Sequence, residues 1–133
     1  MQTSEAAQRW AQTWARAWPL KDIEAIAELQ AVGGDHWASM FRPFRGRAGL
    51  RSYLQECFAE ETQPAETWFA DPVVDGASAS VEYWVVIYLK GQPVTISGCT
   101  VLAFDESGLV TVARDYSNVR EGRLERPSQA FTR

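Results

Sequence analysis

The sequence predicts an α+β fold in which a curved antiparallel sheet wraps around N-terminal helices and encloses a cone. In most of the segment 4–61 the apolar side chains recur at helical spacing. Residues 67–119 instead have the pattern of extended segments joined by hairpin turns. The chain has 133 residues, 46% of them hydrophobic and 23% charged, which is typical of one globular domain and excludes a disordered protein. We therefore expect residues 1–133 to form one domain that ends in a polar tail, residues 120–133.

The first helix is expected over residues 4–18. Ser4 suits the N-cap position, because its hydroxyl can accept a hydrogen bond from a free backbone N–H, and Pro19 is expected to end the helix. Three tryptophans recur at every fourth position and so form one stripe along this helix: Trp10, Trp14 and Trp18.

Two more helices are expected before the sheet. Asp22 suits the N-cap of a short helix over residues 23–30, which the Gly33-Gly34 pair would break. Residues 35–44 are expected to form a short strand and then a loop at Arg42-Pro43. A third helix is expected over residues 46–61, with a core-facing stripe at these positions: Leu50, Tyr53, Leu54, Cys57 and Phe58.

The remaining residues predict four strands in hairpin order. These strands are expected over residues 67–74, 79–89, 94–104 and 109–119, with turn signals such as Asp75-Gly76 between them. The tail from Arg120 onward alternates arginine with glutamate, and we expect it either to fray or to pack on a partner subunit.

Charge and motif content exclude several classes of function. The net charge of −4 argues against nonspecific binding to nucleic acid or to an anionic membrane. No apolar run is long enough to span a bilayer, no signal-peptide pattern begins the chain, and one histidine among scattered acids gives no metal-ligand cluster. We expect a cytoplasmic protein without metal or cofactor, with Cys57 and Cys99 as reduced, buried thiols.

Several short segments occur in an order that is familiar. After the Trp-rich helix come Arg45-Gly46-Arg47 at the start of the third helix, the Val-Glu-Tyr-Trp segment of residues 81–84, the Phe-Asp-x-x-Gly hairpin of residues 104–108 and an Arg-Asp-Tyr triplet at 114–116. This order resembles the SnoaL-like branch of the nuclear-transport-factor-2-like superfamily over nearly the whole chain. The resemblance implies a conical pocket, and its members include polyketide cyclases and ketosteroid-isomerase-like enzymes as well as proteins without known activity.

Asp115 is the leading candidate for a catalytic residue. Strand alternation places it on one face with Thr111 and Ala113, whose small side chains leave room for a ligand. The resemblance implies that the aspartate of the Arg-Asp-Tyr triplet points into the pocket and acts as the acid/base. A carboxylate in an apolar pocket has a raised pKa, which suits a general acid or base near neutral pH. The alternative is a structural aspartate that is hydrogen-bonded to backbone or to a tryptophan.

The strand over residues 79–89 has one mixed face and one apolar face. Glu82 and Trp84 lie on the mixed face, and the resemblance favours placing that face in the pocket and the apolar face at a dimer interface. The opposite arrangement, with the apolar face in the core, remains open. In epoxide-hydrolase relatives this strand carries an arginine and an aspartate two residues apart; Glu82 and Trp84 match that pair here, so that mechanism is not expected.

His36 is the only histidine, and we expect it at the pocket rim as a partner of Asp115. Either His36 or Tyr53 could donate a hydrogen bond to an oxyanion. The arginines around position 42 are expected on a solvated loop. The predicted pocket walls are five aromatic side chains and one glutamate: Trp14, Trp18, Phe41, Tyr53, Glu82 and Trp84.

These residues favour two functions. The first is a cofactor-independent isomerase, cyclase or dehydratase that acts on a small hydrophobic, carbonyl-containing molecule. The second is a noncatalytic protein that uses the same pocket to bind a small molecule. In both cases we expect a homodimer paired through the sheet, because three helices cannot cover both apolar faces of long strands.

Overall fold

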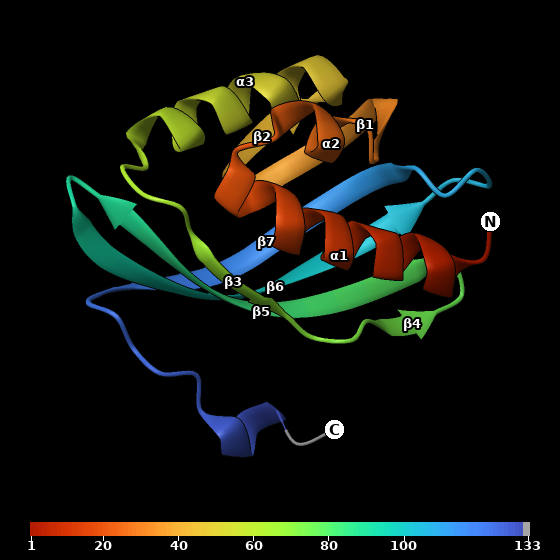
Figure 1. Cartoon of the computed structure of the whole chain (residues 1–133). Helices are drawn as coiled ribbons and strands as arrows, with labels where there is room; N and C mark the ends of the chain where they lie inside the picture. The colour runs from red at the N-terminus through yellow and green to blue at the C-terminus, as the bar shows by residue number, and fades with distance from the viewer. Residues whose placement is uncertain (132–133) are drawn as a thin grey trace.

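Three helices pack on one side of a curved, open sheet of seven strands (Figure 1). The computed structural model describes residues 1–131. The helices are α1 (Thr3–Leu20), α2 (Ile23–Ala27) and α3 (Gly46–Glu60). The strands are β1 (Gln30–Ser39), β2 (Arg42–Arg45), β3 (Glu66–Phe69), β4 (Val73–Asp75), β5 (Ser78–Leu89), β6 (Gln92–Phe104) and β7 (Val110–Glu121). The predicted α+β cone is therefore confirmed.

The sheet is mixed rather than wholly antiparallel. Its order is β2-β1-β7-β6-β5-β3, with β4 pairing with β5 as well, and the β1–β7 pair runs parallel. The parallel pair arises because β1 leaves α2 at the end of the sheet where β7 begins, so that Gln30 lies beside Val110. The other pairs are antiparallel, as predicted; the parallel β1–β7 pair was not foreseen, because pairing between segments far apart in the chain is not visible in local patterns.

Helix α1 crosses the concave face of the sheet and runs longer than expected. Pro19 lies inside its last turn, and the helix ends at Lys21, whose φ of 54° is left-handed. Proline cannot donate to the carbonyl four residues earlier, at Ala15. The Thr67 hydroxyl donates to that carbonyl instead, at 2.7 Å, so the helix tolerates the proline. Ser4 lies within the helix, and Gln2 occupies the N-cap position without a side-chain hydrogen bond.

Residues 28–45 differ from the prediction in three ways. Helix α2 is capped by Asp22 as expected, but it ends at Ala27. Gly33 and Gly34 lie within β1, where a side chain at position 34 would collide with the backbone of β7. The expected loop at Arg42-Pro43 is strand β2, which pairs with β1 as a hairpin.

The strands after α3 follow the prediction except at the first one. The segment expected as one strand over residues 67–74 is divided into β3 and β4, which both pair antiparallel with β5. Strands β5, β6 and β7 lie within a few residues of their expected bounds.

The core lies between the helices and the concave face of the sheet. Trp10 and Trp14 of α1 and Leu50 and Leu54 of α3 are buried against central strand residues such as Val81. Burial of this apolar stripe supplies the main driving force for folding.

The two faces of β5 are arranged opposite to the favoured interpretation. Tyr83 and Val85 of the apolar face point into the molecule and are buried, whereas Glu82 is exposed on the outer face and Trp84 lies beside it. The apolar face is buried because the concave side packs on helices, while the convex side meets solvent and the tail. The placement of Glu82 and Trp84 in the pocket was therefore wrong.

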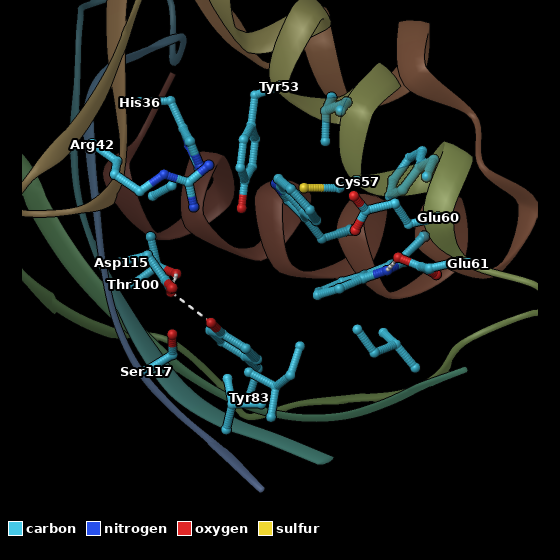
Figure 2. A pocket seen from close by; sticks show the side chains of 18 of the residues that line it. His36, Arg42, Tyr53, Cys57, Glu60, Glu61, Tyr83, Thr100, Asp115 and Ser117 are labelled. Atoms are coloured by element: carbon cyan, nitrogen blue, oxygen red, sulfur yellow. Dashed lines mark hydrogen bonds between the residues drawn. The ribbon is translucent and has the colours of Figure 1, made fainter. Parts of the chain in front are cut away.

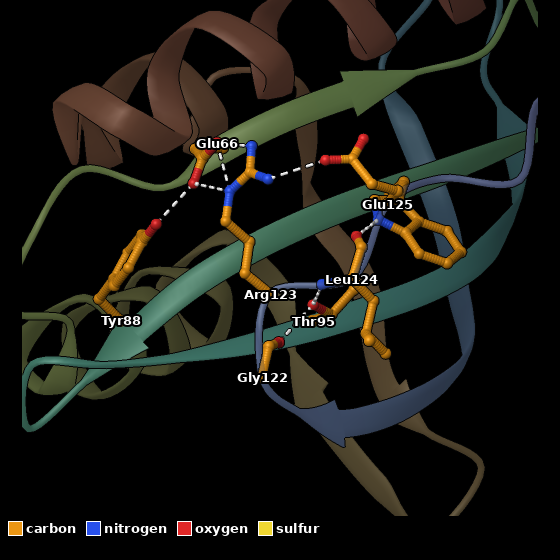
Figure 3. A network of polar contacts seen from close by, with 8 residues as sticks. Glu66, Tyr88, Thr95, Gly122, Arg123, Leu124 and Glu125 are labelled. Atoms are coloured by element: carbon orange, nitrogen blue, oxygen red, sulfur yellow. Dashed lines mark hydrogen bonds and ion pairs between the residues drawn. The ribbon is translucent and has the colours of Figure 1, made fainter.

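The tail folds back over the outer face of its own sheet (Figures 1 and 3). Arg123 forms an ion pair with Glu66 of β3 at 2.6 Å, and the Trp84 indole N–H donates to the Leu124 carbonyl. The Thr95 hydroxyl of β6 donates to Gly122 and accepts from the Leu124 N–H. The tail ends in a short 3₁₀ helix, Ser128–Phe131.

Within residues 1–131 there is no helix with the length and apolar character needed to cross a membrane.

Candidate functional site

A cavity of about 280 Å³ lies between α1, α3 and the concave face of the sheet (Figure 2). Its walls are largely apolar and carry seven Phe, Trp or Tyr side chains from the described residues, because the tryptophan stripe of α1 turns toward the sheet. Trp14 and Trp18 come from α1, Tyr53 and Phe58 from α3, and Tyr83 from β5. Polar side chains from β1, β6 and β7 gather at one end. A largely apolar cavity with a few polar groups is the usual form of a small-molecule site.

Asp115 of β7 is the acidic group at this polar end. Its Oδ1 accepts a hydrogen bond of 2.6 Å from the Tyr83 hydroxyl and one of 3.2 Å from the Thr100 hydroxyl. Burial raises the pKa of Asp115 above its ordinary value, although hydrogen bonds from Tyr83, Ser117 and Thr100 oppose that rise. The carboxyl group is therefore desolvated, held in one orientation and able to exchange a proton.

Tyr83 reaches Asp115 because the strand between them carries a glycine. Tyr83 on β5 pairs with Gly98 on β6, which pairs in turn with Ser117 on β7. The phenol ring lies over Gly98, where a Cβ would collide with it. Burial and the neighbouring Asp115 raise the pKa of Tyr83, so its hydroxyl remains a donor.

His36 and Tyr53 lie side by side in the cavity wall. Their ring centroids are 5.1 Å apart, and His36 also stacks on Trp14 at 6.4 Å. His36 is only 6% exposed, and burial lowers its pKa to about 4, so its imidazole is neutral at pH 7. Burial also raises the pKa of Tyr53, whose hydroxyl points into the cavity toward the side of Asp115 and Arg42 (Figure 2).

Several predicted site residues come together and others do not. Asp115, His36, Trp14, Trp18 and Tyr53 all line the cavity. His36 is buried in the wall rather than exposed at the rim, and Asp115 takes its hydrogen bonds from Tyr83 and Thr100 rather than from His36.

Three predicted wall residues lie outside the cavity. Phe41 is 93% exposed at the tip of the β1–β2 hairpin, because the loop expected there is a tight turn that directs its side chain to solvent. Glu82 and Trp84 lie on the outer face of β5, as described above. Because successive side chains of a strand point to opposite faces of the sheet, these two side chains point away from the cavity.

Other cavity residues were not singled out from the sequence. Tyr83, Thr100 and Ser117 surround Asp115, and Glu61 adds another carboxyl group to the lining. Arg42, which was expected on a solvated loop, lies on β2 and also lines the cavity. Tyr83 could have been recognised from its place on the apolar face opposite a mid-strand glycine. Glu61 had no sequence signal, since its position depends on where α3 ends relative to β5.

Metal ligands are not clustered in the described part of the chain: residues 1–131 contain no group of three or more His, Cys, Asp or Glu side chains that could hold an ion. Cys57 and Cys99 are free and partly buried, and burial raises the pKa of both thiols. Neither thiol is therefore activated as a nucleophile.

Three helices against a curved, open sheet, with a half-buried carboxyl group in the wall of the cavity between them, define a protein of the nuclear-transport-factor-2-like superfamily. Residues 8–113 match the family described as the SnoaL-like domain. The chain belongs to this SnoaL-like family, as the order of its sequence segments predicted. No curated protein matches it.

Solved structures of distant relatives share the fold. SalBIII, an epoxide hydrolase/cyclase-like enzyme in pyran ring formation in the polyether salinomycin, has 17% identity and a TM-score of 0.77, covering 91% of this chain and 99% of its own. An LEH-like epoxide hydrolase of M. tuberculosis has 19% identity and a TM-score of 0.72, covering 88% and 86%. A hypothetical protein of Catenulispora acidiphila DSM 44928 with a ketosteroid-isomerase-like fold, in complex with trimethylamine, has 19% identity and a TM-score of 0.69, covering 79% and 82%. At these identities the similarity shows the fold alone.

Proposed function

We propose that this protein is a cofactor-independent enzyme that transfers a proton on a small, largely apolar carbonyl compound, as an isomerase or cyclase does. The observation that carries the proposal is Asp115, a half-buried carboxyl group on the wall of a largely apolar cavity, whose pKa is raised by partial burial. Membership of the SnoaL-like family and the similarity to the cyclase-like enzyme SalBIII support cyclase-type chemistry.

In this reaction Asp115 acts as the base. It takes a proton from the carbon next to the carbonyl group, the C–H electron pair moves toward the carbonyl oxygen, and the proton can return at another carbon. The enolate oxygen requires a hydrogen-bond donor. The Tyr53 hydroxyl suits that role, because burial keeps it protonated and it points toward the end of the cavity where Asp115 lies. Tyr83 is already bonded to Asp115.

Epoxide hydrolysis fits this cavity less well. The concave positions of β5 are Val81, Tyr83 and Val85, so this strand supplies neither the arginine nor the aspartate that the epoxide-hydrolase arrangement requires. Glu82, which was matched to that pair, faces solvent.

The test is Asp115→Asn, which keeps the shape of the side chain and removes the base. We expect the wild-type protein to accelerate exchange of the protons next to the carbonyl of 2-tetralone in D₂O, followed by NMR. Asp115→Asn should slow that exchange by roughly 100-fold or more, while the ketone still binds. Glu82→Gln, which changes a carboxylate on the outer face, is the matched control and should leave the rate unchanged. Equal rates for the wild type and Asp115→Asn would contradict the proposal.

A second candidate is binding without catalysis. It is favoured by the hydrogen bonds that Tyr83 and Thr100 donate to Asp115 Oδ1, since such bonds also hold a purely structural carboxylate. In that case the wild-type protein binds the ketone but does not accelerate exchange, and Asp115→Asn loses stability instead of activity.

A further inference from the structure

Glu61 is a buried carboxyl group in the cavity wall, and proton transfer at Asp115 does not use it. The residue is 8% exposed. Its Oε2 accepts a 3.0 Å hydrogen bond from the Trp18 indole N–H, whereas its Oε1 is buried and has no hydrogen-bond donor among the described residues. A buried oxygen without a partner is unfavourable, and native proteins seldom leave one unless a ligand or water completes it.

The local fold holds this carboxyl group in place. Glu61 directly follows α3, its backbone N–H donates to the Phe58 carbonyl, and it forms an isolated bridge with Leu89 at the end of β5. The indole of Trp18 is packed in turn against Trp14, with ring centroids 5.5 Å apart. The position of Oε1 is therefore set by rigid elements, as a binding group requires.

Glu61 and Asp115 lie at opposite ends of the cavity (Figure 2). Aromatic and aliphatic side chains, among them Tyr83 and Ile87, line the space around them. A ligand with its carbonyl group beside Asp115 therefore extends an apolar body toward Glu61. The charge of Lys21 favours the ionised form of Glu61, whose oxygens only accept hydrogen bonds.

We propose that Glu61 Oε1 accepts a hydrogen bond from a hydroxyl group of the ligand, at the end of the cavity away from Asp115. The ligand class is an apolar molecule with a carbonyl group at one end and a hydroxyl group at the other. The inference rests on the proposed function in taking the carbonyl end to lie at Asp115. Burial raises the pKa of Glu61, and the hydrogen bond from Trp18 opposes that rise.

The experiment compares four ketones by isothermal titration calorimetry at pH 7.5: 2-tetralone, its 6-hydroxy and 7-hydroxy derivatives and 6-methoxy-2-tetralone. For the wild type, we expect at least one hydroxy derivative to bind about 10-fold more tightly than 2-tetralone, because it satisfies Oε1. The methoxy compound cannot donate and should show no such gain.

The decisive variant is Glu61→Gln. Its amide oxygen still accepts from Trp18, which places the NH₂ group at the former position of Oε1 and replaces an acceptor by a donor. The hydroxyl advantage should disappear, and the methoxy compound should bind at least as tightly as the hydroxy compounds. Glu56→Gln is the matched control, since Glu56 is an exposed glutamate of α3 that does not line the cavity, and it should keep the hydroxyl preference.

Three results would overturn the inference: no gain from either hydroxyl group in the wild type, an equal gain from the methoxy group, or an unchanged preference in Glu61→Gln. The wild-type comparison stands even if Glu61→Gln does not fold. Hydroxyl preference without catalysed exchange would refute the proposed function and support the Glu61 site. Catalysed exchange that requires Asp115, without a preference for the hydroxy compounds, would support the proposed function and refute the Glu61 site.

Discussion

Asp115 and Tyr83 form a pair in which each group changes the proton affinity of the other. The Tyr83 hydroxyl donates to the carboxylate at 2.6 Å and so favours its charged form, against the effect of burial. The balance determines the pH at which Asp115 becomes a base. A cavity of the same shape without this hydroxyl would hold a less acidic carboxyl group.

Tyr83→Phe tests this balance. Loss of the hydroxyl removes a hydrogen bond that lowers the Asp115 pKa, so that pKa should rise further. If Asp115 acts as the base, the acidic limb of the pH profile for ketone exchange should move to higher pH. Tyr88→Phe, which removes a hydroxyl bonded to Glu66 at an exposed site, is the control and should leave the profile in place. A shift to lower pH would contradict the assignment.

His36 should make stability depend on pH in the acidic range. Its pKa falls from 6.5 in the unfolded chain to about 4 in the folded protein because of burial. Between these values the unfolded chain binds the proton and the folded protein does not, so stability is complete above pH 6.5 and falls as the pH drops toward 4. The full loss is about 3 kcal/mol.

Replacement of His36 by Phe keeps a flat ring between Trp14 and Tyr53 and removes the titrating group. We expect His36→Phe and the wild type to unfold at similar urea concentrations at pH 7.5. At pH 4.5 the variant should be more stable relative to the wild type. Parallel stability curves for the two proteins across this range would show that His36 does not titrate between the folded and unfolded states.

At the scale of elements, the tail is attached to β6 through one side chain. The Thr95 hydroxyl is buried, donates to Gly122 at 2.6 Å and accepts from the Leu124 N–H at 3.0 Å. The nearby ion pair between Arg123 and Glu66 is exposed to solvent, and exposed ion pairs contribute little to stability. The buried threonine therefore holds the tail more firmly than the charged contact does (Figure 3).

Thr95→Val keeps the volume of the side chain and removes both hydrogen bonds. We expect a loss of roughly 1–3 kcal/mol in the free energy of unfolding and faster hydrogen exchange at the Leu124 amide. Arg123→Gln should have a much smaller effect on the melting temperature. If Arg123→Gln released the tail and Thr95→Val did not, the ion pair and not the threonine would be the stronger attachment of the tail.

At the scale of the whole molecule, the outer face of the sheet remains partly uncovered. The tail passes over Trp84, but Tyr116 of β7 is still 48% exposed on that face. We propose that a second copy of the chain covers the remaining surface, because exposed aromatic patches on long strands commonly mark an interface.

Light scattering at micromolar concentration should then give the mass of two chains. Tyr116→Asp places a charge in the proposed interface and should give the mass of one chain, while Phe41→Ser, at the exposed tip of the β1–β2 hairpin, should leave the dimer intact. A wild-type protein of single-chain mass would contradict the dimer.

The sequence by itself determined the three helices, the long strands β5, β6 and β7, the tryptophan stripe of α1 and the face on which Asp115 lies. These features follow from periods of 3.6 and 2 residues, which are local and visible in one chain. The same alternation separated Tyr83 from Glu82 on β5 but left open which face was inside.

Only the tertiary structure decided that choice, because it depends on which side of the sheet the helices cover. Three other features likewise join residues that are far apart in the chain: the parallel pairing of β1 with β7, the contact of Tyr83 with Asp115 over Gly98, and the place of Glu61 beside Trp18. Local patterns carry no information about such contacts, since closure of long loops, and not residue spacing, brings these groups together.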